Sequence, residues 1–218
     1  PNHPQLVAVA GCIGAGKTTL ARALAEALEG EMIAEAYDTN PYLPQVCAGR
    51  RDLALDSQLY FLHSRVEQLD RDRLLPGVVY VSDYVFDKDR LFAQRTLDSA
   101  QYAAYDTQAR ALAGRVAEPA LVLFLRVTAE VCLKRVHQRN RPYEQRLQLA
   151  SLRTLIEQYE VLFADWRRCP VIRVDGDRFD GRRAEDRARI VEQVRAYLCP
   201  AGEAKAAHGD CGNHQRGA

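Results

Sequence analysis

The sequence lacks the features of several large protein classes. Its six cysteines form no Cys-x-x-Cys pair and keep no regular spacing, so they predict reduced thiols rather than a disulfide framework. No apolar run approaches the roughly 20 residues that cross a bilayer. The first residues, Pro1 to Pro4, lack the basic and apolar regions of a signal peptide. We therefore expect a cytoplasmic protein that makes no contact with a membrane.

An excess of charge of one sign is also absent. Lys and Arg total 30 against 29 Asp and Glu, and a net charge of +1 is too small for a general nucleic-acid binder. The 218 residues are 47% hydrophobic, which suffices for one well-buried domain. After Pro200 the apolar periodicity stops. We expect one folded domain over residues 1–199 and a disordered tail over residues 200–218.

Short apolar runs alternate with amphipathic segments along the chain. The β-branched run 78–81 has the continuous hydrophobicity of a buried parallel strand, whereas 53–73 carries an apolar stripe at helical spacing. Strands that alternate with helices predict an α/β three-layer sandwich, with a parallel five-stranded sheet covered by helices on both faces. The strands are expected over 6–10, 32–34, 78–81, 120–125 and 171–174, and the helices over 17–28, 53–73, 88–97, 101–116, 129–138, 147–166 and 184–198.

A complete phosphate-binding signature, Gly-x-x-x-x-Gly-Lys-[Ser/Thr], lies between the first predicted strand and helix. Glycines let the backbone wrap so that N–H groups point at phosphate oxygens, and the helix start adds its positive dipole end. Lys17 is placed to reach the β- and γ-phosphates of ATP, and the Thr18 hydroxyl to bind Mg²⁺. The residues expected to hold the nucleotide are Gly11, Gly14, Ala15, Gly16, Lys17, Thr18 and Thr19.

Two acids follow predicted strands at the edge where open parallel sheets bind ligands. Asp83 ends the run 78–83, where it is placed to hold Mg²⁺ directly or through water, although an Asx turn or helix cap would explain it too. Glu35 follows the strand over 32–34, and a carboxylate there can accept a proton from an attacking hydroxyl. The sequence contains no Asn-Lys-x-Asp or Thr-Lys-x-Asp that would read guanine, which argues against a GTPase.

An arginine cluster lies on the predicted helix over 129–138 and in the loop after it, and this helix directly follows the buried strand over 120–125. Arg135 and Arg139 are spaced to share one helix face, and Arg141 lies in the loop beyond. Such clusters pin phosphates and stabilise charge on a transferring phosphoryl group, with Arg139 as the catalytic candidate. A solvated basic face is the structural alternative. The position after a buried strand favours a closing lid.

Together these segments resemble the deoxyribonucleoside kinase family, in its bacterial deoxyadenosine, deoxyguanosine and deoxycytidine kinase branch. The resemblance implies a P-loop kinase fold with an Arg-rich lid, and a homodimer. It also implies ATP- and Mg²⁺-dependent phosphorylation of the 5′-hydroxyl of one of those three deoxynucleosides in nucleotide salvage. It covers about Val7 to Asp175 and is carried by residues 11–19, 35–43, 57–65, 82–93 and 135–144.

The resemblance also implies roles for single residues. Glu35 matches the candidate general base, while Asp83 matches an acid that is assigned to Mg²⁺, to the 5′-hydroxyl or to the base role. On one helix face, Gln58 matches the amide that pairs with the nucleobase edge, although it would otherwise be taken for a surface glutamine. The other residues implied to bind the substrate are Phe61, Arg65, Asp89 (with Lys88 as the alternative alignment) and, through the sugar 3′-hydroxyl, Glu144.

Two positions depart from the family pattern. The family motif Asp/Glu-Arg-Ser is here Asp83-Tyr84-Val85, so the charge of its arginine must come from elsewhere or be absent. Cys47 stands where relatives have a tyrosine that shares the 3′-hydroxyl, and a thiol is a poor hydrogen-bond partner.

Two other functions remain open on the sequence. A thymidylate or other nucleoside monophosphate kinase would need extra basic residues for the acceptor phosphate, and Arg50, Arg51 and Arg95 are candidates. A catalytically weak, nucleotide-binding regulatory paralogue is suggested by the two departures. Retention of Lys17 and Glu35, among others, argues against that loss of chemistry.

Overall fold

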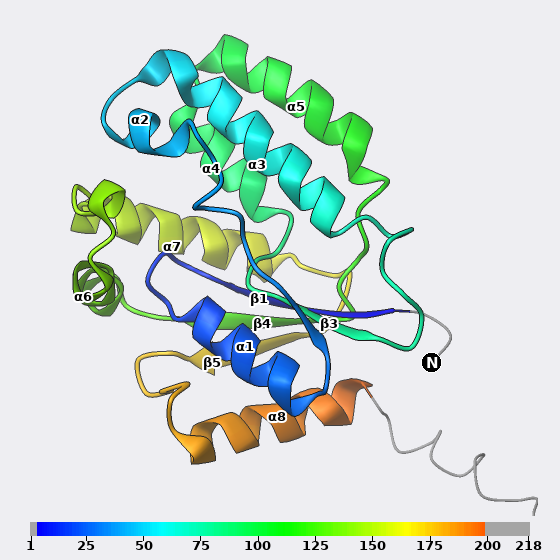
Figure 1. Cartoon of the computed structure of the whole chain (residues 1–218). Coiled ribbons are helices and arrows are strands. Elements are labelled where there is room, and N and C mark those ends of the chain that lie inside the picture. Colours follow the sequence, from blue (N-terminus) through cyan, green and yellow to red (C-terminus); the bar gives the residue numbers. More distant parts are fainter. Residues whose placement is uncertain (1–3, 199–218) are drawn as a thin grey trace, which may run out of the picture.

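A parallel sheet of five strands forms the middle layer of the structure, a computed structural model whose described residues are 4–198 (Figure 1). The strand order is β2-β3-β1-β4-β5, and every pairing is parallel. The predicted α/β fold is therefore confirmed. The predicted disordered tail, residues 200–218, lies outside the described residues. The strands are β1 (Gln5–Gly11), β2 (Glu31–Ile33), β3 (Val79–Ser82), β4 (Leu121–Arg126) and β5 (Val171–Asp175).

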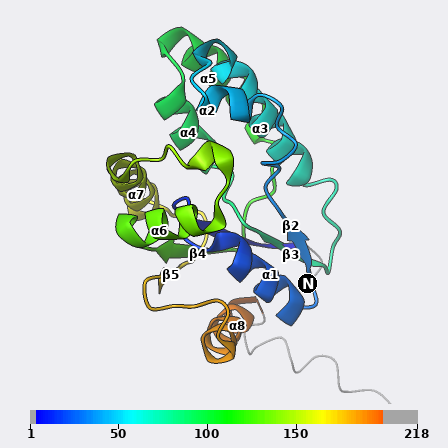
Figure 2. The same cartoon turned by 60° about the vertical axis from the view of Figure 1, so that its left-hand side comes forward.

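Helices cover both faces of this sheet. α1 and α8 lie on one face, while α3, α4, α5 and α7 lie on the other, and a turn of the view shows α6 beside α7 (Figures 1 and 2). No described helix is both long and apolar enough to cross a membrane. The α-helices are α1 (Lys17–Ala27), α2 (Leu43–Cys47), α3 (Ala54–Gln68), α4 (Lys88–Thr96), α5 (Ser99–Ala113), α6 (Ala129–Arg139), α7 (Leu149–Ala164) and α8 (Ala184–Leu198).

The apolar strands explain the layers. A run buried on both faces needs a helix above and below it, and the side chains of β1 divide in this way. Leu6 packs into the cluster with α3 and α5, whereas Val7 and Val9 belong to the larger core. On β4, the Phe124 ring lies 4.7 Å from that of Phe163, a centroid distance typical of aromatic packing, and this contact anchors α7.

Several predicted element boundaries were wrong. The helix expected over 53–73 begins as a 3₁₀ turn, Arg51–Leu53, and its α-helical part ends at Gln68. Asp70 instead pairs with Val116 in an isolated bridge, and its carboxylate accepts hydrogen bonds from the Asp72 N–H and from Arg115. The short helix α2 was not predicted. The expected loop 139–145 contains a 3₁₀ turn, Pro142–Glu144, after α6 has run on to Arg139.

Gly14 in the loop after β1 allows a stability prediction with a matched control. Its φ is 81°, and a Cβ there would overlap the carbonyl oxygen of Cys132. Gly77 has nearly the same φ, 79°, but a Cβ there would meet nothing within 4 Å. Gly77→Ala should lower the free energy of unfolding by roughly 1–2 kcal/mol for the left-handed backbone alone. Gly14→Ala should lower it by about 1–3 kcal/mol more, because of the overlap.

Urea denaturation of both variants measures the difference between them. Equal losses would show that the close approach of Gly14 to α6 does not constrain the loop.

Candidate active site

The phosphate-binding loop connects β1 to α1 at the carboxyl edge of the sheet. Gly16 precedes α1 in the left-handed region, with φ 99°, and the Ala15 N–H donates to the Cys12 carbonyl over 3.1 Å. Lys17 Nζ donates to the same carbonyl oxygen over 2.9 Å, so its ammonium group is held at the loop itself. The predicted strand–loop–helix context of the signature is confirmed.

Asp83 connects this loop to the residues that follow β2, the strand that pairs with β3 on the side opposite to β1. Its Oδ2 accepts a hydrogen bond from the Thr18 hydroxyl over 2.6 Å, and its Oδ1 accepts one from the Glu35 N–H over 2.9 Å. The strand register, with Ile33 opposite Ser82, brings the two acids to the same edge. Thr18 and Asp83 offer only oxygen atoms, which are the ligands that Mg²⁺ prefers.

Four charged side chains, one of which is Glu35, form a cluster in the interior. Arg65 bonds to Oε1 of Glu35, Lys88 Nζ donates to Oε2 over 2.5 Å, and Arg65 also pairs with Asp89. Each of the four side chains is only 1–4% exposed. Two carboxylates and two cations balance, which buried charges require because unpaired ones are costly to desolvate.

The neighbours of Glu35 decide its protonation. Burial by itself raises the pKa of Glu35, but the charges of Lys88 and Arg65 outweigh it and hold this pKa well below its ordinary value. Burial lowers the pKa of Lys88 to about 7; Glu35 opposes this shift, and the charge of Arg65 adds to it. Glu35 is therefore a carboxylate at neutral pH, while Lys88 is the member of the pair that exchanges its proton nearest to neutrality.

A cavity of about 310 Å³ opens beside this cluster. Gln58, Phe61 and Arg65 line it from one face of α3, as their spacing predicts. Gln58 is only 7% exposed, so the interpretation as a surface glutamine is wrong, and its buried Oε1 has no hydrogen-bond partner among residues 4–198. A buried, unpaired amide oxygen facing a cavity is an acceptor available to a ligand.

The predicted lid residues hold one another in this structure. Arg139 bonds to Glu144 through Nε and Nη2, both over 2.6 Å, and Arg141 lies 3.7 Å from the same carboxylate. Arg135 donates to the Ala15 carbonyl of the phosphate-binding loop over 3.1 Å and to the Gly176 carbonyl over 3.0 Å. Only Glu144 of these lid residues lines the cavity.

The two departures from the family pattern have clear structural positions. Tyr84 is buried, and its hydroxyl donates to Gln68 over 2.7 Å. The positive charges on Glu35 come instead from Arg65 and Lys88. Cys47 lines the cavity, and burial, with a smaller effect of the nearby Glu144, raises the pKa of its thiol.

Several cavity residues were not singled out from the sequence, and three of them carry a titratable group: Lys88, Tyr37 and Tyr143. Lys88 appeared only as the alternative to Asp89, and the structure brings both into the cluster. Tyr37 appeared only within the matching segment 35–43. Burial raises the pKa of its hydroxyl, and the negative charge of the nearby Glu35 raises this pKa further. Tyr143 has a buried hydroxyl without a partner. A polar side chain beside a recognised motif residue is the only signal that the sequence offered for them.

Comparisons with known proteins agree on one family. The family model described as "Deoxynucleoside kinase" matches residues 7–200. Deoxyguanosine kinase of Bacillus subtilis is 31% identical over 186 residues, which cover 82% of this chain and 90% of the relative. Deoxyadenosine kinase of Dictyostelium discoideum is also 31% identical, over 79% of this chain and 73% of its own.

Solved structures show the same fold. A deoxyadenosine kinase from M. mycoides, with the products dCMP and a flexible dCDP bound, superposes with a TM-score of 0.76 over 88% of this chain and 99% of its own. The same enzyme with bound dATP gives a TM-score of 0.74. Both are 22% identical to this chain, so the likeness concerns the arrangement of the sheet and its helices.

Proposed function

This chain belongs to the deoxynucleoside kinase family, and on that premise we propose that its acceptor is deoxyadenosine, deoxyguanosine or deoxycytidine. The γ-phosphoryl group of ATP goes to the 5′-hydroxyl in a step of nucleotide salvage. One observation carries the proposal. Asp83 bonds both to Thr18 of the phosphate-binding loop and to the backbone of Glu35, which borders the cavity lined by Gln58.

The residues divide the work by position. In the proposed complex, the loop glycines and Lys17 hold the phosphates of ATP, and Thr18 and Asp83 hold Mg²⁺, which neutralises charge on those phosphates when bound. Glu35 orients the 5′-hydroxyl and accepts its proton, as a carboxylate held ionised by two cations can. Phosphoryl transfer runs through a loose transition state, so positioning outweighs deprotonation.

The lid completes the proposed site. Arg139 and Glu144 satisfy each other here, so the approach of substrates must exchange that pair for contacts with the phosphoryl group and the sugar 3′-hydroxyl. Arg135 and Arg141 would add charge on the phosphate side. Arg65 lies on the cavity wall together with Gln58, whereas Asp89 does not line this cavity and would act on the nucleobase only through its ion pair with Arg65.

The nucleoside monophosphate kinase alternative finds less support. It needs Arg50, Arg51 and Arg95 near the acceptor, but Arg50 pairs with Asp52 at the surface over 2.6 Å and neither it nor Arg51 lines the cavity. Of the three arginines, only Arg95 lines the cavity, and it donates a hydrogen bond to the Ser151 carbonyl. The curated relatives reported above are nucleoside kinases by name.

A substrate panel tests the proposed function. ATP-dependent phosphorylation should be fastest with deoxyadenosine, deoxyguanosine or deoxycytidine, and slower with thymidine and dTMP. Gln58→Leu should lower kcat/KM for the best nucleoside by about 10–10²-fold, because it leaves a buried base edge unpaired. Gln138→Leu, an exposed glutamine on α6, is the matched control. Thymidine or dTMP as the best acceptor would contradict the proposal.

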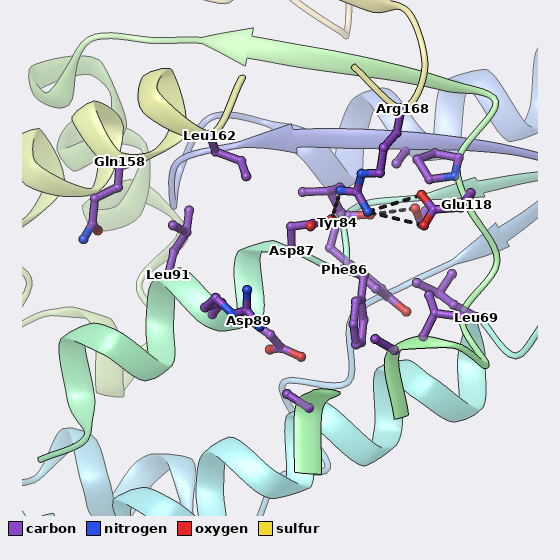
Figure 3. A pocket seen from close by; sticks show the side chains of 18 of the residues that line it. Leu69, Tyr84, Phe86, Asp87, Asp89, Leu91, Glu118, Gln158, Leu162 and Arg168 are labelled. Atoms are coloured by element: carbon purple, nitrogen blue, oxygen red, sulfur yellow. Dashed lines mark hydrogen bonds and ion pairs between the residues drawn. The ribbon is translucent and has the colours of Figure 1, made fainter. Parts of the chain in front are cut away.

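We also propose that the protein is a homodimer. A cavity of about 570 Å³ lies against α4, α5 and α7, and Leu91 and Leu162 point toward it from α4 and α7 (Figure 3). Val161 lines the same cavity and is 71% exposed, so this face carries an exposed apolar side chain beside an apolar hollow.

Light scattering at micromolar concentration should give the mass of a dimer. Val161→Asp should shift it toward the monomer, while Leu75→Asp, at another exposed apolar position, should not. A monomeric mass for the wild-type chain refutes the dimer.

We also propose that the reaction takes place in the cytoplasm. Cys12, Cys47, Cys132 and Cys169, the cysteines within residues 4–198, are all free. Free thiols are the usual state in reducing compartments.

A further inference from the structure

Lys88 is a buried side chain that lines the cavity, and the roles proposed above use it only as one of the two positive charges beside Glu35. It is the first residue of α4, only 3% exposed, and its Nζ lies 5.2 Å from the centre of the Phe92 ring and 5.5 Å from that of Tyr37. The aromatic rings and the helix start fix where its ammonium group lies. Lys88 lines the cavity together with Glu35.

The hydrogen bonds of Glu35 explain what Lys88 does there. Arg65 takes one carboxylate oxygen and Lys88 takes the other, so both oxygens are held and the carboxylate cannot turn about its last bond. A carboxylate has about four lone-pair sites; Arg65, Lys88 and the Tyr37 hydroxyl use three of them, so one remains for a ligand in the cavity. Without Lys88, the guanidinium of Arg65 would hold only Oε1, because its other terminal nitrogen pairs with Asp89.

A purely structural ion pair explains Lys88 less well. Desolvating two charges costs about as much as their attraction returns, so a buried ion pair is weak support for a fold. Of the described residues, only Glu35 accepts a hydrogen bond from the three ammonium protons. Two donors therefore remain on a group that borders the same cavity as the carboxylate.

We propose that Lys88 is the positioning residue of Glu35: it fixes the orientation of the carboxylate while the 5′-hydroxyl is bound. This inference rests on the proposed function, because it gives Glu35 a hydroxyl to orient. A misplacement of about 1 Å in such a group costs about 10²-fold in rate. The effect must pass through Glu35 and leave ATP binding alone.

A double-mutant cycle tests this dependence. Lys88→Met, which keeps the length of the side chain, should lower kcat by about 10²-fold with an unchanged KM for ATP. In a Glu35→Gln background the same substitution should cause no further loss, since there is no carboxylate left to orient. Lys88→Arg should recover most of the activity. Arg90→Met, on the same helix but paired with Asp106 at the surface, is the matched control and should leave kcat unchanged.

The outcomes separate this inference from the function beneath it. A wild-type chain that phosphorylates no deoxynucleoside removes the proposed function itself. With an active wild type, the role of Lys88 is overturned by a near-normal Lys88→Met, by losses that multiply in the double variant, or by Lys88→Arg as slow as Lys88→Met. If Lys88→Met melts below the assay temperature, Lys88→Gln replaces it in the same cycle.

Discussion

Lys17→Ala is expected to abolish turnover, with a loss in kcat of at least about 10³-fold. Lys17 is the side-chain charge that the phosphate-binding loop fixes in place, through the 2.9 Å hydrogen bond from its Nζ to the Cys12 carbonyl. In the proposed complex with ATP, this ammonium group would compensate the negative charge that develops during phosphoryl transfer. Removing one preorganised donor of this kind costs about 10²–10³-fold elsewhere, and a full charge should cost more.

The measurement compares initial rates of the wild type and the variant with ATP and the best deoxynucleoside of the panel. Lys134→Ala is the matched control, because Lys134 is an exposed lysine on α6. Thermal melting of both variants shows that they remain folded. Near-normal turnover by Lys17→Ala would contradict the assignment of the loop as the ATP site.

Features encoded by neighbouring residues could be predicted from the sequence. The loop from Gly11 to Thr18 follows from glycine conformation and a helix start, which act over a few residues. The face shared by Gln58 and Arg65 follows from the helical repeat alone. The parallel sheet follows from continuous β-branched runs such as 78–81, since only strands buried on both faces need them.

Features set by distant residues could not be predicted in this way. α3 ends at Gln68 because Asp70 is held by Arg115, which is 45 residues away. Lys88 bonds to Glu35 across 53 residues, and no spacing rule marks that pair. The pairing of Arg139 with Glu144 is local, yet two different roles had been expected for these residues. Whether the guanidinium of Arg139 binds a phosphate or the carboxylate of Glu144 depends on whether a nucleotide occupies the site, which no sequence pattern encodes.

Glu35 and Asp83 should respond differently to loss of charge, because they contact different parts of the site. Asp83 bonds to Thr18, the expected Mg²⁺ ligand of the loop. Asp83→Asn should therefore lower kcat and raise the Mg²⁺ concentration for half-maximal rate by about 10–100-fold. Glu35→Gln should lower kcat by about 10²–10⁴-fold, the range of general base catalysis, at an unchanged Mg²⁺ requirement. Mg²⁺ titrations of the two variants decide the division.

The pH dependence adds a second criterion. A group with a lowered pKa keeps its charged form above that pKa and loses it as the pH falls, so the Glu35 carboxylate should be lost only in acid, whereas the ammonium form of Lys88, whose pKa is about 7, is lost as the pH rises past neutrality. Lys88 and Arg65 hold the pKa of Glu35 well below its ordinary value, and wild-type kcat should therefore stay level down to about pH 5. Glu35→Gln should show no acid limb at all. Neutralising the acid that binds Mg²⁺ should weaken Mg²⁺ binding. If Glu35→Gln, and not Asp83→Asn, raises the Mg²⁺ requirement, the roles of the two acids are therefore reversed.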